Sequence, residues 1–335
     1  MEVIEHVPIR VADASGPGEA RRVGLDLARS LGFGETDVGR VGIIVTEAAT
    51  NLVKHGGGGE ILLRVLRNAR SSGVSLLALD RGPGLSDLAG AMRDGFSSAG
   101  SPGTGLGAIK RLAAVFDAYS QPGHGTALLA SVWPSSPPAA VSGLRIGGVN
   151  VPYPGETVSG DVWAVSETPK RALLLLCDGL GHGAPAAAAS AIATDVFRQH
   201  TDASPGDVVE RIHAALRPTR GAAVAVTEID AAKGIARFAG LGNVAGTILA
   251  DGSTRSVVSH HGTAGHIARR IDEFTYPWPP GAVLVLHSDG VASQWTLDRY
   301  PGIALREPTL VAGVLYRDFR RGRDDTTIVV VREES

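Results

Sequence analysis

Several aspartates in the second half of the chain lie at the ends of apolar segments, where carboxylates from different strands can meet. A single aspartate at a strand end is usually a turn former. Four or five gathered in one domain would repel one another, and hard divalent cations are their natural partners. The pattern therefore indicates a metal site built from carboxylates. The aspartates concerned are Asp161, Asp178, Asp289, Asp324 and Asp325.

A different set of residues in the first half suits a nucleotide. Glu47, Asn51 and His55 are spaced by four, so they share one face of a predicted helix. An apolar run later ends at Asp80, whose carboxylate can accept a hydrogen bond from an exocyclic amine. Glycine-rich turns follow, and backbone N–H groups at the start of a helix can hold phosphates. The glycines are Gly82, Gly84, Gly103, Gly105 and Gly107.

The hydrophobic pattern predicts the elements that carry these residues. In the first half we expect a mixed α+β sandwich, and in the second half two sheets sandwiched between helices. The helix after Gly105 is expected to run through Phe116, and Ser71-Ser72-Gly73 is expected to be a turn. Other main predicted helices are 37–55, 184–200, 205–216 and 309–319, and main strands are 60–67, 74–80, 126–133, 172–178 and 283–288.

The composition fits a protein of about two domains, with 335 residues and an uncharged, Pro- and Ser-rich break at residues 134–143. The net charge of −2 gives no electrostatic argument for nucleic acid or an anionic membrane as a partner. No apolar run approaches the roughly 20 residues that span a bilayer. The single Cys177 and the absence of a signal-peptide pattern predict a cytoplasmic location.

Residues 3 to 132 resemble the GHKL ATPase superfamily with the Bergerat fold, and more closely the RsbT-like anti-sigma-factor serine/threonine kinases. No single glycine turn is specific, but four blocks occur in the order of that family. They are Thr46–Asn51, Asp80–Gly84, Met92–Ser98 and Gly103–Leu112.

The resemblance implies a role for each matching residue. Asp80 would accept from the adenine amino group, assisted by Thr126, and Asn51 would place its amide oxygen on Mg²⁺. Glu47 would be the general base that takes the proton from a protein Ser or Thr hydroxyl. Residues 85 to 102 would cover the triphosphate, and backbone N–H groups at the glycines would approach the phosphates. The implied ligands are ATP and Mg²⁺.

Residues 144 to 331 resemble the PPM-type, metal-dependent serine/threonine phosphatases, in particular the SpoIIE-like branch and its short RsbX-like members. The resemblance implies two Mn²⁺ or Mg²⁺ ions whose shared water attacks phosphorus. Asp178 would bridge the ions, the Gly179 carbonyl would bind one, Asp289 and Asp324 the other, and Asp161 would act through water. The matching blocks are Ser159–Trp163, Cys177–Gly183, Leu241–Val244, Ser288–Gly290 and Arg323–Thr327.

The chain is therefore predicted to have a Bergerat-fold α/β sandwich at 1–133, a linker at 134–143 and a PPM-type α-β-β-α sandwich at 144–335. The two resemblances imply a partner-switching regulator that phosphorylates and dephosphorylates a STAS-domain protein, with no prediction of oligomeric state. One alternative is a first half that binds ATP and only sequesters a partner. A histidine-kinase-like ATPase is disfavoured because no phosphoacceptor helix precedes residue 15, and zinc is disfavoured because no cysteine pair accompanies the histidines.

Overall fold

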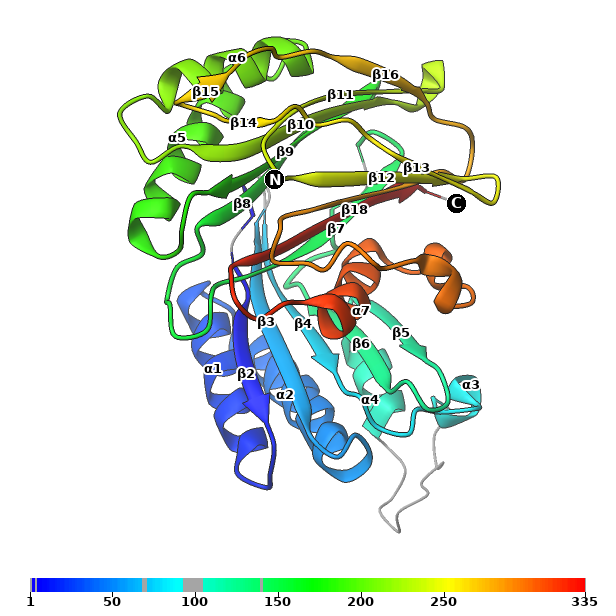
Figure 1. Cartoon of the computed structure of the whole chain (residues 1–335). Helices are drawn as coiled ribbons and strands as arrows, with labels where there is room; N and C mark the ends of the chain where they lie inside the picture. The colour runs from blue at the N-terminus through cyan, green and yellow to red at the C-terminus, as the bar shows by residue number, and fades with distance from the viewer. Residues whose placement is uncertain (1, 4, 68–70, 93–104, 139–140, 335) are drawn as a thin grey trace. The chain divides into compact units, whose positions relative to one another are not determined.

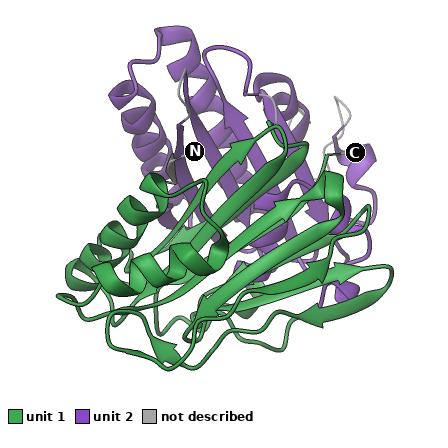
Figure 2. Ribbon diagram, turned by 90° about the horizontal axis from the view of Figure 1, so that it is seen from above, with its two compact units in different colours: residues 1–5, 139–295, 318–335 green, residues 6–138, 296–317 purple. Residues whose placement is uncertain are grey.

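The computed structural model describes residues 2–3, 5–67, 71–92, 105–138 and 141–334, and its contacts divide the chain into two compact units. Figure 2 shows them in different colours. The N-terminal unit comprises residues 6–138 and 296–317, and the C-terminal unit comprises residues 1–5, 139–295 and 318–335. Each unit combines helices with antiparallel sheet, which confirms the predicted α+β class.

The N-terminal unit is built on one antiparallel sheet with the order β2-β3-β4-β6-β5. Helices α1 and α2 contact the sheet, and α4 contacts β5 and β6 at one edge of it (Figure 1). The strands are β2 (Val7–Val11), β3 (Gly59–Arg67), β4 (Ser72–Leu79), β5 (Val115–Ser120) and β6 (Thr126–Val132). The helices are α1 (Gly16–Ser30), α2 (Glu35–His55), α3 (Leu88–Ala91), α4 (Gly105–Leu112), the 3₁₀ turns η2 (Leu297–Arg299) and η3 (Ile303–Leu305), and α7 (Pro308–Phe319), whose last two residues belong to the other unit.

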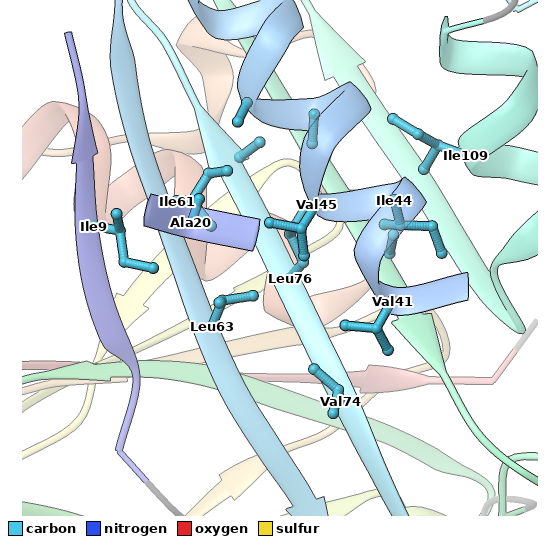
Figure 3. Packing of buried hydrophobic residues seen from close by; sticks show 14 of the residues in the cluster. Ile9, Ala20, Val41, Ile44, Val45, Ile61, Leu63, Val74, Leu76 and Ile109 are labelled. Atoms are coloured by element: carbon cyan, nitrogen blue, oxygen red, sulfur yellow. The ribbon is translucent and has the colours of Figure 1, made fainter. Parts of the chain in front are cut away.

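One hydrophobic core joins these helices to the sheet (Figure 3). On β3 and β4 every second residue points to the helices, as strand geometry requires, with Ile61 and Leu63 on one strand and Leu76 on the next. On α2 the apolar residues Val41 and Val45 recur at helical spacing and face the same core. Each such aliphatic side chain contributes about 1.5–3 kcal/mol when fully buried. The polar stripe of α2 is thereby fixed beside the core.

The C-terminal unit contains two five-stranded antiparallel sheets, with the orders β16-β11-β10-β9-β8 and β13-β12-β17-β18-β7. Their strands are β7 (Leu144–Val151), β8 (Asp161–Thr168), β9 (Arg171–Gly179), β10 (Ala222–Asp230), β11 (Ile235–Leu241), β12 (Ala245–Ala250), β13 (Ser253–Ser256), β16 (Phe274–Pro277), β17 (Val283–His287) and β18 (Thr326–Glu333). The unit also contains β1 (Glu2–Val3) and a two-stranded sheet of β14 (Gly262–Thr263) and β15 (Ile267–Ala268). The helices are α5 (Ala184–Gln199), α6 (Pro205–Ala215) and the 3₁₀ turn η1 (Ala231–Lys233).

Two cores hold these layers together. The first lies between the sheets and includes Trp163, Phe238 and Leu284. The second lies between the β8–β11 sheet and the helices, and includes Leu175 and Phe197. Central strands such as β9 are therefore buried on both faces, which explains the unbroken apolar run before Asp178. Both faces of this strand must be covered before its end can present a carboxylate.

Two local predictions in the N-terminal unit are wrong. Helix α4 ends at Leu112, and Val115 and Phe116, which were predicted to continue it, begin β5. The Ala114 N–H donates to the Ser131 carbonyl (2.8 Å) and starts the pairing of β5 with β6. β-Branched and aromatic residues favour that strand. Ser72 and Gly73 belong to β4, where a Cβ on Gly73 would lie 2.6 Å from the ring of Trp133. This glycine makes room for an indole and does not form a turn.

Candidate active sites

The polar stripe of α2 faces the start of α4. A Cβ placed on Gly105 would lie 3.3 Å from Glu47 Oε2 and 3.4 Å from Asn51 Oδ1, so these three residues are in contact distance. The Arg40 guanidinium holds the helices together by donating two hydrogen bonds to the Leu112 carbonyl, at 3.1 and 2.7 Å. The buried Asn51 Nδ2 has no hydrogen-bond partner among the described residues. A buried polar atom beside a glycine cradle fits a polar ligand.

Asp80 lies at the end of β4 and is held by the backbone on two sides. Its Oδ1 accepts from the Gly82 N–H (2.8 Å) and from the Thr126 N–H (3.1 Å). Burial raises the pKa of the carboxyl above its ordinary value, although these two bonds and the charges of Arg317 and His55 lower it. The Asp80 carboxylate is therefore fixed in position and poorly hydrated. Both properties suit a group that accepts a hydrogen bond from a nucleotide base.

The remaining predicted residues of this site lie near these. Gly82 and Gly84 form the turn after Asp80, and Gly107 is buried inside α4. Gly103 and residues 93–102 of the expected lid lie outside the described residues. The structure groups Glu47 and Asn51 with Gly105, and Asp80 with Thr126. We call these two groups together the N-terminal site. Its members are Glu47, Asn51, Asp80, Gly105 and Thr126.

A pair of glycines in the turn before Thr126 gives a matched test of this geometry. Gly123 and Gly125 both have φ of +77°, which disfavours any other residue. A Cβ on Gly123 meets nothing within 4 Å, whereas one on Gly125 would overlap the Asp80 carbonyl oxygen. We expect Gly123→Ala to cost about 1 kcal/mol of unfolding free energy and Gly125→Ala clearly more. Chemical denaturation measures both, and equal costs would contradict the close approach at Asp80.

In the C-terminal unit four predicted metal ligands come from four strand ends. Asp161 begins β8 and is the register partner of Asp178 near the end of β9. Asp289 follows β17, and Asp324 precedes β18. The Ser288 N–H donates to the Thr327 carbonyl (3.0 Å) and Ser288 Oγ accepts from the Thr327 N–H (3.0 Å), which keeps these two strand ends together. We call these residues the aspartate cluster (Asp161, Asp178, Asp289 and Asp324).

The aspartate cluster is electrostatically strained. Burial, together with the charges of Asp161, Asp289 and Asp324, raises the pKa of Asp178 to about 9. Burial also raises the pKa of Asp161 to about 7, with a further contribution from the charges of Asp325 and Asp324. Burial likewise raises the pKa of Asp324 above its usual range. Carboxylates this close are stable in charged form when a cation neutralises them.

The donor set fits a hard divalent cation. Oδ2 of the buried Asp161 has no hydrogen-bond partner among the described residues, so it is open to a ligand. Carboxylates and a carbonyl such as that of Gly179 are the oxygen donors that Mg²⁺ and Mn²⁺ prefer. Within the described part of the chain, no three His, Cys, Asp or Glu side chains are already arranged around one ion position. The side chains would therefore adjust when an ion binds.

Gly179 is required by the packing of this loop. A Cβ at this position would lie 2.5 Å from the Ala186 carbonyl oxygen at the start of α5 and 3.0 Å from the Gly160 carbonyl oxygen. The Gly179 N–H donates to that same Gly160 oxygen (3.1 Å). The position after Asp178, between β8 and α5, therefore has room only for glycine. The Gly179 backbone lies at the edge of the aspartate cluster.

Asn243 and Asp325, which lie outside the aspartate cluster, hold it in place. Asn243 Nδ2 donates to Asp289 Oδ2 (2.6 Å). Asp325 accepts from the Tyr153 N–H (2.7 Å) and the Gly160 N–H (2.8 Å), so both of its oxygens are engaged with backbone. Its bonds make Asp325 an orienting residue. In the sequence, Asn243 is marked only by its place in the matching block Leu241–Val244. That block does not indicate that Asn243 bonds to Asp289.

His182 is also positioned, by two residues from a distant turn. Its Nδ1 lies 2.7 Å from Glu156 Oε1, and its ring stacks on Tyr153 with centroids 4.4 Å apart. The charge of His182 lowers the pKa of both Asp324 and Asp325, although burial raises each overall. The imidazole thus stands at the rim of the aspartate cluster. His182 lies in the sequence block Cys177–Gly183, whereas Glu156 lies in none of the matching blocks.

The raised pKa values predict how pH affects the metal-free protein. Asp161 and Asp178 bind protons more tightly when folded than in the unfolded chain, where Asp has a pKa of about 3.9. Their contribution to stability is complete below about pH 4 and is lost as pH rises through about 7 and 9. With EDTA present, the C-terminal unit should unfold at a lower temperature at pH 8.5 than at pH 5.5.

The variant Asp178→Asn isolates this effect. Relative to the variant, metal-free wild type should lose about 1.4 kcal/mol of unfolding free energy per pH unit between the unfolded and folded pKa values of Asp178. Adding Mn²⁺ should restore wild type and leave the variant unchanged. A difference between the two proteins that does not vary with pH would contradict the buried, mutually repelling carboxylates.

Comparisons with known proteins agree with the two units. Residues 11–132 match the family model described as a histidine kinase-like ATPase domain, and residues 168–333 match that of stage II sporulation protein E, SpoIIE. Over 114 residues the chain is 37% identical to the serine/threonine-protein kinase RsbT of Bacillus subtilis, covering 34% of this chain and 86% of RsbT. The chain is a fusion of an RsbT-family domain and a SpoIIE-type phosphatase domain. The RsbT-like domain contains the N-terminal site, and the phosphatase domain contains the aspartate cluster.

One solved structure supports the fold over about half of this chain. A chain from a structure described as "The bacterial stressosome: a modular system that has been adapted to control secondary messenger signaling" superposes with a TM-score of 0.52. It is 23% identical, and the match covers 56% of this chain and 99% of that one. RsbX in complex with magnesium matches with a TM-score of 0.48 at 18% identity, covering 57% of this chain and 95% of that one.

The fusion therefore pairs a kinase-like domain with a PP2C-type phosphatase domain, and both are of the kinds found in partner-switching systems. Asp178, Asp289 and Asp324 fall inside the residues matched to SpoIIE, and Asp161 falls just before them. None of the described helices is both long enough and apolar enough to cross a membrane.

Proposed function

We propose that the RsbT-like domain transfers the γ-phosphoryl group of ATP to a Ser or Thr of a STAS-domain protein, and that the phosphatase domain removes it. The kinase proposal is supported by the position of the Glu47 carboxylate and the Asn51 amide, which lie beside Gly105 at the start of α4. The observation that carries the second half is the aspartate cluster, whose mutual repulsion calls for cations. The proposed setting is a cytoplasmic regulator of the anti-anti-sigma or stressosome type.

In the kinase reaction, the residues position ATP and take one proton. Asp80 accepts from the adenine amino group, beside Thr126, and the α4 N-terminus with Gly103, Gly105 and Gly107 holds the phosphates. Asn51 provides an oxygen for Mg²⁺. The substrate hydroxyl oxygen attacks the γ-phosphorus, the bond to the ADP oxygen breaks, and Glu47 accepts the hydroxyl proton.

In the phosphatase reaction, Asp178, the Gly179 carbonyl, Asp289 and Asp324 would hold two Mg²⁺ or Mn²⁺ ions, with Asp161 acting through water. Such ions supply a water of lowered pKa and neutralise the phosphoryl oxygens. The protein's own contribution is to hold the ligands. Asn243 fixes one oxygen of Asp289, and Asp325 ties the turns around the aspartate cluster to the backbone.

A paired assay tests the proposal. STAS-domain proteins encoded near this chain are incubated with Mg-ATP and the protein, and phosphate incorporation is followed by mass spectrometry. The phosphorylated forms are then incubated with the protein and Mn²⁺ without nucleotide, and phosphate loss is followed. We expect both reactions on the same residue of one STAS protein.

The two halves of the assay can fail separately. If ATP binds and no STAS protein is phosphorylated, the RsbT-like domain sequesters a partner and is not a kinase. If phosphate is not released with Mn²⁺ or Mg²⁺, the phosphatase assignment is wrong. The position of Glu47 beside Gly105 favours catalysis over sequestration, because a binding module needs no base there.

A further inference from the structure

The N-terminal unit contains a segment that comes from the phosphatase half of the sequence. Residues 296–317 group with residues 6–138, although the ATPase family match ends at residue 132 and the SpoIIE match runs from 168 to 333. This segment ends in α7. The RsbT-like domain of this chain is thus completed by residues that lie outside the ATPase match.

The first half of α7 is fixed to the sheet by direct contacts. Asp117 on β5 accepts from the Glu307 N–H (2.8 Å) and from the Arg306 guanidinium (3.2 Å), just before the helix begins. Further along, a Cβ on Gly313 would lie 3.2 Å from the methyl groups of Leu77. The backbone of α7 therefore packs directly against β4, on the face opposite the core that α2 covers.

The other end of α7 is bonded to the residue that anchors the N-terminal site. The buried Arg317 donates from Nη1 to the carbonyl oxygen of Asp80 (3.0 Å). In return, the Arg81 guanidinium donates to the Arg317 carbonyl oxygen. Arg317 thus fixes the peptide that follows Asp80, and with it the turn that places the carboxylate on Gly82 and Thr126.

Immediately after Arg317 the chain enters the C-terminal unit and bonds to the loops of the aspartate cluster. The Phe319 carbonyl accepts from the Ala292 N–H (2.9 Å), and the Arg321 N–H donates to the Gly290 carbonyl (2.8 Å). Gly290 follows Asp289 in the chain, and Asp324 lies three residues beyond Arg321. A short series of covalent and hydrogen bonds therefore links Asp80 to the loops that carry two of the predicted metal ligands.

We infer that Arg317 is a positioning residue of the nucleotide site, and that α7 couples nucleotide binding to metal binding at the aspartate cluster. A nucleotide on Asp80 orders the turn that Arg317 holds. When the end of α7 is already ordered, metal binding at Asp289 and Asp324 costs less conformational entropy. Nucleotide binding should therefore increase the affinity for metal, which is positive coupling. Linkage makes the effect reciprocal, and couplings of this kind change affinity by about 5- to 150-fold. The inference rests on the ligands named in the proposed function.

The first measurement is the affinity of the full chain for a fluorescent ADP analogue. Loss of a buried hydrogen bond from a charged group predicts that Arg317→Ala weakens ADP binding by about 10-fold or more, with Arg317→Lys restoring part of it. Arg306→Ala is the matched control, because it removes an arginine of the same segment whose guanidinium donates to Asp117 on β5. Equal ADP affinity in wild type and Arg317→Ala would overturn the positioning role.

The second measurement is a double-mutant cycle with Asp178→Asn, which removes the predicted bridging ligand. With Mn²⁺ present, Asp178→Asn should weaken ADP binding about 5-fold or more in wild type and in Arg306→Ala. In the Arg317→Ala background, Asp178→Asn should not change the affinity for ADP. If Arg317→Ala does not fold, Arg317→Lys replaces it and should show a smaller coupling than wild type.

An unchanged ADP affinity in Asp178→Asn, or the same change with and without Arg317, would overturn the coupling. The readout is nucleotide affinity alone. A chain that binds ADP but transfers no phosphate would therefore refute the kinase proposal and leave this inference standing.

Discussion

Asp178→Asn is expected to reduce removal of phosphate from a phosphorylated STAS protein by about 1,000-fold or more, while phosphate transfer from ATP continues. Asp178 is the most strongly perturbed carboxyl of the aspartate cluster, because burial and then the charges of three neighbouring aspartates raise its pKa. Asparagine keeps the size and removes the charge that would hold the cations. Cations at such sites contribute several kcal/mol to the transition state, and every 1.4 kcal/mol is tenfold in rate. Single-turnover release of phosphate measures the loss.

Asp195→Asn is the control for that experiment. Asp195 is exposed on α5 and pairs with Arg198 in the same helix, so its removal should leave the release rate unchanged. Comparable rates in Asp178→Asn and Asp195→Asn would mean that the metal ligands have been assigned wrongly.

Glu47→Gln is expected to lower the rate of phosphate transfer to the STAS protein by about 100- to 10,000-fold, the usual contribution of a general base. The affinity for ADP should change little, because glutamine has nearly the same shape and Glu47 is assigned to the substrate proton. Release of phosphate by the other domain should be unaffected. Rapid-quench measurement with saturating Mg-ATP gives the rate of transfer directly.

Glu35→Gln provides the comparison on the same helix. Glu35 lies in the first turn of α2, exposed and far along the chain from the polar stripe. The Glu35→Gln variant should transfer phosphate at the wild-type rate. If Glu47→Gln also does so, then another group takes the proton and the base has been misassigned.

Much of the architecture could be predicted because it depends on local patterns. The apolar run before Asp178 predicts a strand buried on both faces, and the fourfold spacing of Glu47 and Asn51 predicts a shared helical face. Each pattern brings a functional group to the end or side of one element. The structure then brings Gly105 to the helix and Asp161 to the neighbouring strand.

The residues that hold these groups in place could not be predicted in the same way. Asn243, Glu156 and Arg317 act through partners 46, 26 and 237 positions away in the chain. An arginine near the end of a largely apolar helix is ordinary in sequence, and its hydrogen bond to a backbone carbonyl depends on tertiary packing. The same packing explains why residues 296–317 join the N-terminal unit, which no linker or composition change in the sequence announces.

The central claim is that one chain adds phosphate to a STAS protein and removes it from the same residue. The most direct test follows the phosphorylated fraction of that protein over time with Mg-ATP and Mn²⁺ both present. Wild type should reach a partial, steady level while ATP continues to be consumed. Asp178→Asn should drive phosphorylation toward completion, and Glu47→Gln should produce almost none. Identical phosphorylated fractions in wild type and Asp178→Asn would contradict the account.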